Sequence, residues 1–341
     1  MQNSSKPQHD DRQFYTTLKD KVWLESELVR SWLVNDPNFF ADLLKSSEML
    51  VPGLLPVLDR IEEKTGKPLQ HLRRASKMLP IMLDGTDHAA LRRSLAVYLA
   101  QKTDLAKQML PKILSACLAP LQKPGTVNAH HDVVQPLVTE FMSLLAGKPL
   151  PHEILNLRLD LILNINKSPS QVIDLDRRFG IAFDFLEKDC ADELDMACRI
   201  CCITFGSETL VMMLVENVLS AIAASSAAHP AVLGDFPSET GVPLTWRRAS
   251  NAMDVGGCPI RSGDHVQLKL QTAAYSEKPA VRNVVFGAGP HSCIGKQITM
   301  LLWETFRVAF NALEIQGRLG TYDAIVEPHM RRYNKAEVEI L

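Results

Sequence analysis

The sequence has few of the features that mark a secreted or membrane-anchored protein. No apolar stretch near the N-terminus could serve as a signal peptide. The seven cysteines are an odd number in a chain of 341 residues, and they fit no disulfide framework of the kind found in short secreted proteins. We therefore expect a cytoplasmic protein that has no membrane partner.

The chain also has little net charge and few aromatic residues. A formal net charge of −2 produces no strong surface field, which argues against a nucleic-acid partner. Hydrophobic residues make up 46% of the chain and aromatic residues 6%, which is enough to build a large core. We expect the polar residues 1–12 to form a disordered lead-in and residues 13–341 to form a single domain.

Helices are predicted in most of the first third of the chain. Apolar residues recur at three- and four-residue spacing in several segments of residues 13–120. The first of these segments is FYTTLKDKVWLESELVRSWL, residues 14–33. Breaks between helices are expected at Pro37, at Pro52–Gly53 and at Asp84–Gly85.

The longest helical pattern spans residues 193–225 and is apolar on nearly all sides. Such a helix either spans a membrane or lies buried in a large protein. Its polar residues Arg199, Glu208, Glu216 and Asn217 are too many for a segment that faces lipid. We therefore predict a central buried helix.

The remaining elements complete the fold class. Two helices are predicted around residues 133–146 and 151–165, and a final one begins near Gly295. Alternation in HVQLKLQ (residues 265–271) predicts a strand, and the tail beyond Gly317 is strand-like. The predicted fold class is mainly α with a small β region late in the chain.

The most informative segment is Phe286-Gly-Ala-Gly-Pro-His-Ser-Cys-Ile-Gly295, which presents Cys293 directly before the final helix. Free backbone N–H groups and the helix dipole at such a position stabilise a thiolate, the form that binds metals. Gly287 and Gly289 permit a tight turn. A lone cysteine in a loop is more often a buried structural residue, but the ten-residue pattern favours a ligand.

This pattern resembles the cysteine-ligand loop of the cytochrome P450 superfamily, Phe-Gly-x-Gly-x-His-x-Cys-x-Gly, at every defined position. The resemblance implies a P450-like fold with the central helix over the haem, haem b as cofactor and Cys293 as the iron ligand. Phe286, Gly287 and Gly295 would then border the cofactor, Gly295 by leaving room for the flat macrocycle.

The resemblance also implies a set of haem propionate partners. His88 and Arg92 are four residues apart, hence on one helix face, and the family uses a similar pair to hold a propionate. Arg247 matches a further propionate-binding arginine, and His291 is the fourth candidate. Without the resemblance, His88 and Arg92 would be interpreted as part of a solvated basic face.

Phe205-Gly-Ser-Glu-Thr209 resembles the family's oxygen-activation segment, so Gly206, Glu208 and Thr209 are the candidate catalytic residues. The resemblance implies that Thr209 and Glu208 deliver protons. Gly206 and Glu208 are costly in an apolar helix, as is expected of a functional site. The alternative is a helix kink with a satisfied glutamate. Phe205 departs from the small residue usual at its position and should narrow the pocket.

One family feature is missing. The Glu-x-x-Arg motif should lie near Glu239, but Val242 stands in the arginine's place, and Ser276–Val285 is too short for the usual meander. Either the chain braces the cysteine side of the haem itself, with Trp246, Arg248 and Tyr275–Asn283 nearest in sequence, or another protein does. We favour a partner protein or a homo-oligomer.

The expected function is that of a haem-thiolate oxidase or monooxygenase that acts on a small organic molecule in specialised metabolism. Separate electron-transfer proteins would supply the electrons for activation of dioxygen, or peroxide would be used instead. Alternatives are an auxiliary protein that assists a partner enzyme, and a haem sensor or carrier. Segments 60–80 and 150–185 are expected to line the substrate pocket. Cys198, Cys201 and Cys202 are interpreted as core residues rather than a metal site.

Overall fold

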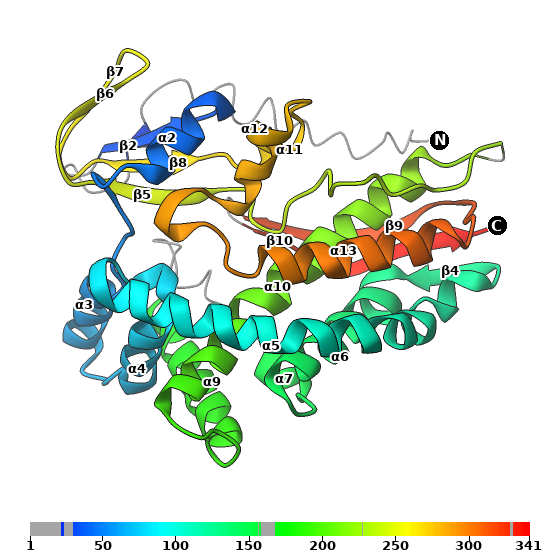
Figure 1. Ribbon diagram of the computed structural model, residues 1–341, viewed down its shortest axis with the longest axis horizontal. Coiled ribbons are helices and arrows are strands. Elements are labelled where there is room, and N and C mark those ends of the chain that lie inside the picture. Colours follow the sequence, from blue (N-terminus) through cyan, green and yellow to red (C-terminus); the bar gives the residue numbers. More distant parts are fainter. Residues whose placement is uncertain (1–21, 24–29, 156, 158–167, 227, 328–329) are drawn as a thin grey trace.

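A computed structural model describes residues 22–23, 30–155, 157, 168–226, 228–327 and 330–341, and the predicted lead-in 1–12 lies outside them. Helices form most of the molecule, with small sheets at its two ends (Figure 1). The predicted fold class, mainly α with a small β region, is confirmed. The α-helices are α2 (Phe40–Lys45), α3 (Leu55–Thr65), α4 (Gln70–Met78), α5 (Gly85–Cys117), α6 (Gln135–Ala146), α7 (His152–Leu155), α9 (Pro169–Glu187), α10 (Glu193–Ala224), α11 (Gln271–Ala274), α12 (Pro279–Arg282) and α13 (Lys296–Asn311).

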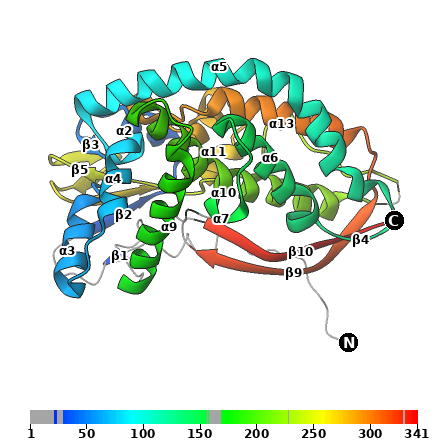
Figure 2. The ribbon, with the colours of Figure 1, turned by 90° about the horizontal axis from the view of Figure 1, so that it is seen from below.

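The central helix α10 was predicted from the sequence and is confirmed. It begins at the Asp192 cap, whose side chain accepts a hydrogen bond from the backbone N–H of Asp195 at 2.8 Å. It runs through the middle of the molecule, between α5 and α13 on one side and the C-terminal strands on the other (Figure 2). By length and composition it could cross a membrane, but most of its apolar stretch is buried inside the molecule, as in a core helix.

All three predicted helix breaks coincide with real boundaries, and Pro52–Gly53 lies between β3 (Met49–Leu50) and α3. Asp84 is the last residue before α5, and Pro37 opens a short 3-10 turn that leads into α2. The final helix α13 likewise starts at Lys296, directly after Gly295. These positions are local in origin, because proline and glycine restrict or free the backbone whatever surrounds them.

The N-terminal prediction was wrong where the structure describes it. Arg30–Val34 is strand β2, not helix. It pairs in parallel with β8 (His265–Leu268), which lies more than 200 residues later in the sequence, and Trp32 stands opposite Val266. The apolar run at residues 32–34 suits a buried strand as well as a helix, and the distant partner decides between them. Residues 14–21 and 24–29 lie outside the described part.

The strands form three small sheets. The largest has the order β1-β2-β8-β5-β3, the second β4-β10-β9, and the third β6-β7. The remaining strands are β1 (Val22–Trp23), β3 (Met49–Leu50), β4 (Gly125–Asn128), β5 (Thr245–Ala249), β6 (Met253–Val255), β7 (Cys258–Ile260), β9 (Gly317–Glu327) and β10 (Met330–Ile340). The strand-like tail was predicted correctly, and the β9–β10 hairpin packs along α10 (Figure 2).

Candidate functional site

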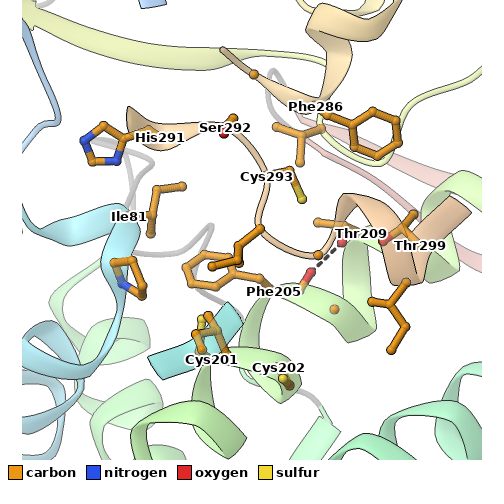
Figure 3. Close-up of a pocket in the computed structure, with 18 of the residues that line it drawn as sticks. Ile81, Cys201, Cys202, Phe205, Thr209, Phe286, His291, Ser292, Cys293 and Thr299 are labelled. Atoms are coloured by element: carbon orange, nitrogen blue, oxygen red, sulfur yellow. Dashed lines mark hydrogen bonds between the residues drawn. The ribbon is translucent and has the colours of Figure 1, made fainter. Parts of the chain in front are cut away.

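An apolar cavity of about 260 Å³ lies between α10 and the loop that carries Cys293. Helices α5, α6, α10 and α13 and strand β5 form its walls together with that loop (Figure 3). The predicted site residues that line it are Arg92, Gly206, Thr209, Arg247, Phe286, Gly287, His291, Cys293 and Gly295. Residues more than 200 positions apart in the sequence therefore meet at one cavity.

The cysteine loop is shaped by two glycines with left-handed backbones. Gly287 has a φ of 73° and Gly289 a φ of 66°, values that side chains other than glycine adopt at a cost. The N–H of Cys293 donates to the carbonyl of Phe286, and the N–H of Ser292 donates to that of Gly289 at 3.1 Å. The turn closes on itself and directs the Cys293 side chain toward the cavity (Figure 3).

Cys293 lies deep among protein atoms but faces the open cavity, so solvent reaches its sulfur. Desolvation raises the pKa of its thiol, while hydrogen bonds from the N–H groups of Gly295 and Lys296 and the charge of Arg92 lower it. These donors lie at the start of α13, where the helix dipole also favours a negative charge. The same groups would stabilise a metal-bound thiolate.

The loop geometry yields a stability prediction. We expect Gly289→Ala to destabilise the haem-free protein by at least about 2 kcal/mol, because φ is positive there and an added Cβ would lie 2.8 Å from the carbonyl oxygen of Leu44. Gly295→Ala is the matched control, since its Cβ would meet its nearest neighbours at an ordinary 3.9 Å. Urea unfolding of both variants checks this. Equal stability of the two would contradict the strained turn.

Four cationic or ionisable side chains gather at one end of the cavity, those of His88, Arg92, Arg247 and His291. The rings of His88 and His291 stack with centroids 4.1 Å apart, and His291 Nε2 lies 2.9 Å from Asp84 Oδ1. Desolvation lowers the pKa of each of the four, that of His88 to about 4 and that of Arg247 to about 10. His88 stands behind His291 and is itself buried.

The hydrogen bonds of this group are incomplete. Among the described residues, His88 Nε2 and Arg247 Nε are buried without a hydrogen-bond partner, and buried polar atoms normally have one. Asp84 is the carboxylate that acts on both histidines and on Arg247. The donor set therefore suits a ligand with additional negative charge, and the two propionates of haem b have that charge and the acceptor oxygens. The residues present fit this cofactor.

The predicted catalytic residues of α10 do not all face the cavity. Gly206 and Thr209 line it, and the Thr209 hydroxyl donates to the Phe205 carbonyl one turn earlier (Figure 3). Glu208 faces away, toward Arg332 of β10 at 3.5 Å, and it lines a second cavity of about 170 Å³. Successive helical residues differ by about 100° in direction, so Glu208 and Thr209 cannot share one face. The structure does not bring Glu208 to the cavity that holds Cys293.

Gly206 has a packing role that the sequence did not reveal. An added Cβ would lie 2.7 Å from Met142 Sδ, so glycine lets α6 approach α10 closely. Cys201, Cys202 and Phe205 occupy the same face of α10 and line the cavity (Figure 3). The two cysteines are buried, as predicted. Their helical spacing from Phe205 and Thr209 was the signal that could have placed them at the site.

The predicted pocket segments contribute little. Of the described residues in 60–80 and 150–185, Pro80 lines the cavity, whereas 156 and 158–167 lie outside the described part. The cavity wall comes instead from α5, α6 and α10, whose segments were predicted only as helices. From periodicity alone, a side chain that faces a cavity cannot be told from one that faces another helix.

Comparison with known proteins gives one clear result. No protein-family model and no curated protein sequence matches the chain. Among solved structures, P450BioI in complex with an acyl carrier protein ligated to hexadec-9Z-enoic acid is similar, with a TM-score of 0.77 at 17% identity over 97% of this chain and 98% of that one. The chain has the cytochrome P450 fold.

Two further structures agree. The myxobacterial cytochrome P450 CYP267B1, in complex with myristic acid, has a TM-score of 0.72 at 15% identity over 97% of this chain and 96% of that one. CYP109B1 from Bacillus subtilis has a TM-score of 0.66 at 15% identity over 97% and 98%. The structural similarity therefore extends over nearly the whole chain.

Proposed function

We propose that this protein is a haem-thiolate oxidoreductase, a monooxygenase or oxidase of the cytochrome P450 type that acts on a small apolar molecule. One observation carries the proposal: the Cys293 thiol and the basic group of Arg92, Arg247 and His291 open onto the same apolar cavity. A structural cysteine would not need a cavity, and a basic surface would not need to be buried.

Different residues would bind different parts of haem b. Cys293 would ligate the iron, with the N–H groups of Gly295 and Lys296 stabilising its charge. His88, Arg92, Arg247 and His291 would bind the propionates through charge-assisted hydrogen bonds. The cofactor, when bound, would supply an iron centre able to activate dioxygen or peroxide.

Thr209 is the residue proposed to control protons in the cavity, because its hydroxyl lies in the cavity wall. Glu208 and Arg332 stand on the other side of α10, so Glu208 could exchange protons with the second cavity and not directly with substrate.

We expect Thr209→Ala to retain the cofactor but to form several-fold less product per reducing equivalent, because protons would then reach the reaction centre without control and reducing equivalents would be diverted to peroxide. Product and peroxide are measured together, with Thr299→Ala as the control. An unchanged ratio would refute the role.

The substrate class follows from the cavity lining. Leu95, Leu99, Phe141 and Leu210 form its walls, and such a surface favours an apolar ligand. Solved structures of the same fold hold myristic acid in CYP267B1 and erythromycin B in a mutant of EryK, so apolar molecules of both kinds are suitable probes. We place the reaction in specialised metabolism in the cytoplasm, with separate electron-transfer proteins or peroxide as co-reactants.

The deciding experiment is spectroscopic. We expect the purified protein reconstituted with haem to give a strongly red-shifted Soret band as its ferrous carbon-monoxide complex, the sign of a thiolate ligand. Addition of myristate or erythromycin B should then shift the spin state. A protein that binds no haem would contradict the proposal. A thiolate spectrum without turnover of any candidate would instead favour a sensor, or an auxiliary protein that assists a partner enzyme.

A further inference from the structure

The segment between α10 and β5 contains a hydrogen-bond network. Residues 238–240 stand where the Glu-x-x-Arg helix was expected, and the structure has no helix in 230–244. Two buried amide side chains hold this segment, Asn217 from α10 and Gln271 from α11, which are 3% and 6% exposed. Burying a polar group costs free energy unless its hydrogen bonds are made, so both amides are expected to be fully hydrogen-bonded.

Asn217 binds the segment from the α10 side. Its Oδ1 accepts from the N–H groups of Ser238 at 2.9 Å and Glu239 at 3.3 Å. Its Nδ2 donates to the carbonyls of Glu239 at 2.9 Å and Met213 at 2.7 Å. Both ends of the amide are therefore used, and three of these four contacts hold backbone groups that a helix would have satisfied internally.

Gln271 binds the same segment from the other side. Its Oε1 accepts from the N–H of Thr240 at 3.0 Å and from the Thr240 hydroxyl at 2.7 Å. Its Nε2 donates to the carbonyl of Ser238 and to the hydroxyl of Tyr275, both at 2.9 Å. The Tyr275 hydroxyl in turn donates to Glu239 Oε1 at 3.3 Å. The two amides thus clamp three successive residues.

The clamped segment touches both sides of the site. Upstream, the Phe236 ring meets the Phe286 ring edge-on, with centroids 6.0 Å apart, at the start of the cysteine loop. Downstream, Gly241 lies against α10 so closely that an added Cβ would be 2.2 Å from the Thr209 carbonyl oxygen. The next residues include Val242 and Arg247, which line the cavity. A shift of residues 238–240 would therefore move the cavity wall.

We propose that Asn217 and Gln271 are positioning residues that take the place of the missing Glu-x-x-Arg motif and hold the cavity wall in register with α10 and the cysteine loop. This inference rests on the proposed haem-thiolate function. It assigns the brace to the chain's own residues, Tyr275 among them, rather than to a partner protein or a second copy of the chain. Buried, fully satisfied polar networks rigidify a structure in this way.

The test compares three variants of the haem-loaded protein. Gln271→Met keeps the volume of the side chain and removes four hydrogen bonds. Gln271→Glu keeps the acceptor for Thr240 and removes the donor to Ser238. Asn311→Leu is the matched control, because Asn311 holds the same loop at Leu233 through two hydrogen bonds, of 2.8 and 3.0 Å, away from the clamped residues. Haem transfer to excess haem-free globin and the carbon-monoxide spectrum are measured for each.

We expect Gln271→Met to lose haem about tenfold faster, which corresponds to about 1.4 kcal/mol, and to show part of the unshifted carbon-monoxide band. Gln271→Glu should give about a threefold change, and it carries the test if Gln271→Met does not fold. Asn311→Leu should lower thermal stability but match the parent protein in both haem measurements. Gln271 variants that behave like Asn311→Leu would overturn the positioning role alone. A parent protein without a thiolate spectrum would overturn the proposed function with it.

Discussion

Cys293→Ala is expected to abolish the red-shifted carbon-monoxide band and all oxidative turnover. Cys293 is the thiol that stands at the start of α13 and opens onto the cavity opposite α10. Its removal takes away the one strong anionic ligand proposed for the iron, and the electronic effect of a thiolate has no neutral substitute. The expected loss of activity is complete, and the loss of haem is partial, because the propionate partners remain.

Cys201→Ala is the matched control for this experiment. Cys201 lines the same cavity, is buried on α10, and its pKa is raised well above the usual range by desolvation, so it remains a neutral thiol. Its removal should leave the thiolate spectrum unchanged. If Cys293→Ala kept the red-shifted band while Cys201→Ala lost it, the ligand assignment would be wrong although the cofactor would stand.

The second large effect is expected at Arg247. We predict that Arg247→Met loses haem about 10–150-fold faster, the equivalent of about 1.5–3 kcal/mol for a hydrogen bond to a charged group. Desolvation lowers the pKa of Arg247 to about 10, so the buried charge is unfavourable in the haem-free protein. The same substitution should therefore leave the stability of the haem-free protein equal or higher.

The opposite signs of these two effects make the prediction specific. Arg248→Met is the control, because Arg248 is the next residue of β5 and its side chain is exposed on the other face. It should change neither haem loss nor stability. Haem transfer and urea unfolding of the haem-free proteins provide the two measurements. An Arg247→Met variant that is destabilised without haem and retains haem normally would show that the guanidinium is structural.

Local chemistry explains what could be predicted. The cysteine loop was predictable because its glycines and its cysteine lie within ten neighbouring residues, directly before the following helix. The apolar run of residues 193–225 could only be satisfied by burial, and α10 is buried. The start of α5 at Gly85 follows from the break that glycine introduces.

Other features depend on partners far away in the sequence. Arg30–Val34 is a strand because β8, more than 200 residues later, pairs with it. Glu208 was assigned to the site through the resemblance of Phe205–Thr209 to the oxygen-activation segment, but the 100° step from Thr209 turns it toward Arg332. The sequence showed that the Glu-x-x-Arg motif is missing. It could not show the proposed replacement, because Asn217 and Gln271 converge on residues 238–240 only in the folded chain.

The sequence alone therefore determined the helical class, the buried central helix and the loop that carries Cys293, because each depends on interactions between near neighbours. Only the tertiary structure decided which face of α10 meets the cavity, how His88 and His291 stack, and which side chains hold residues 238–240. These features depend on contacts between segments that the chain brings together only on folding, and no periodicity within one segment encodes the direction of a side chain in another.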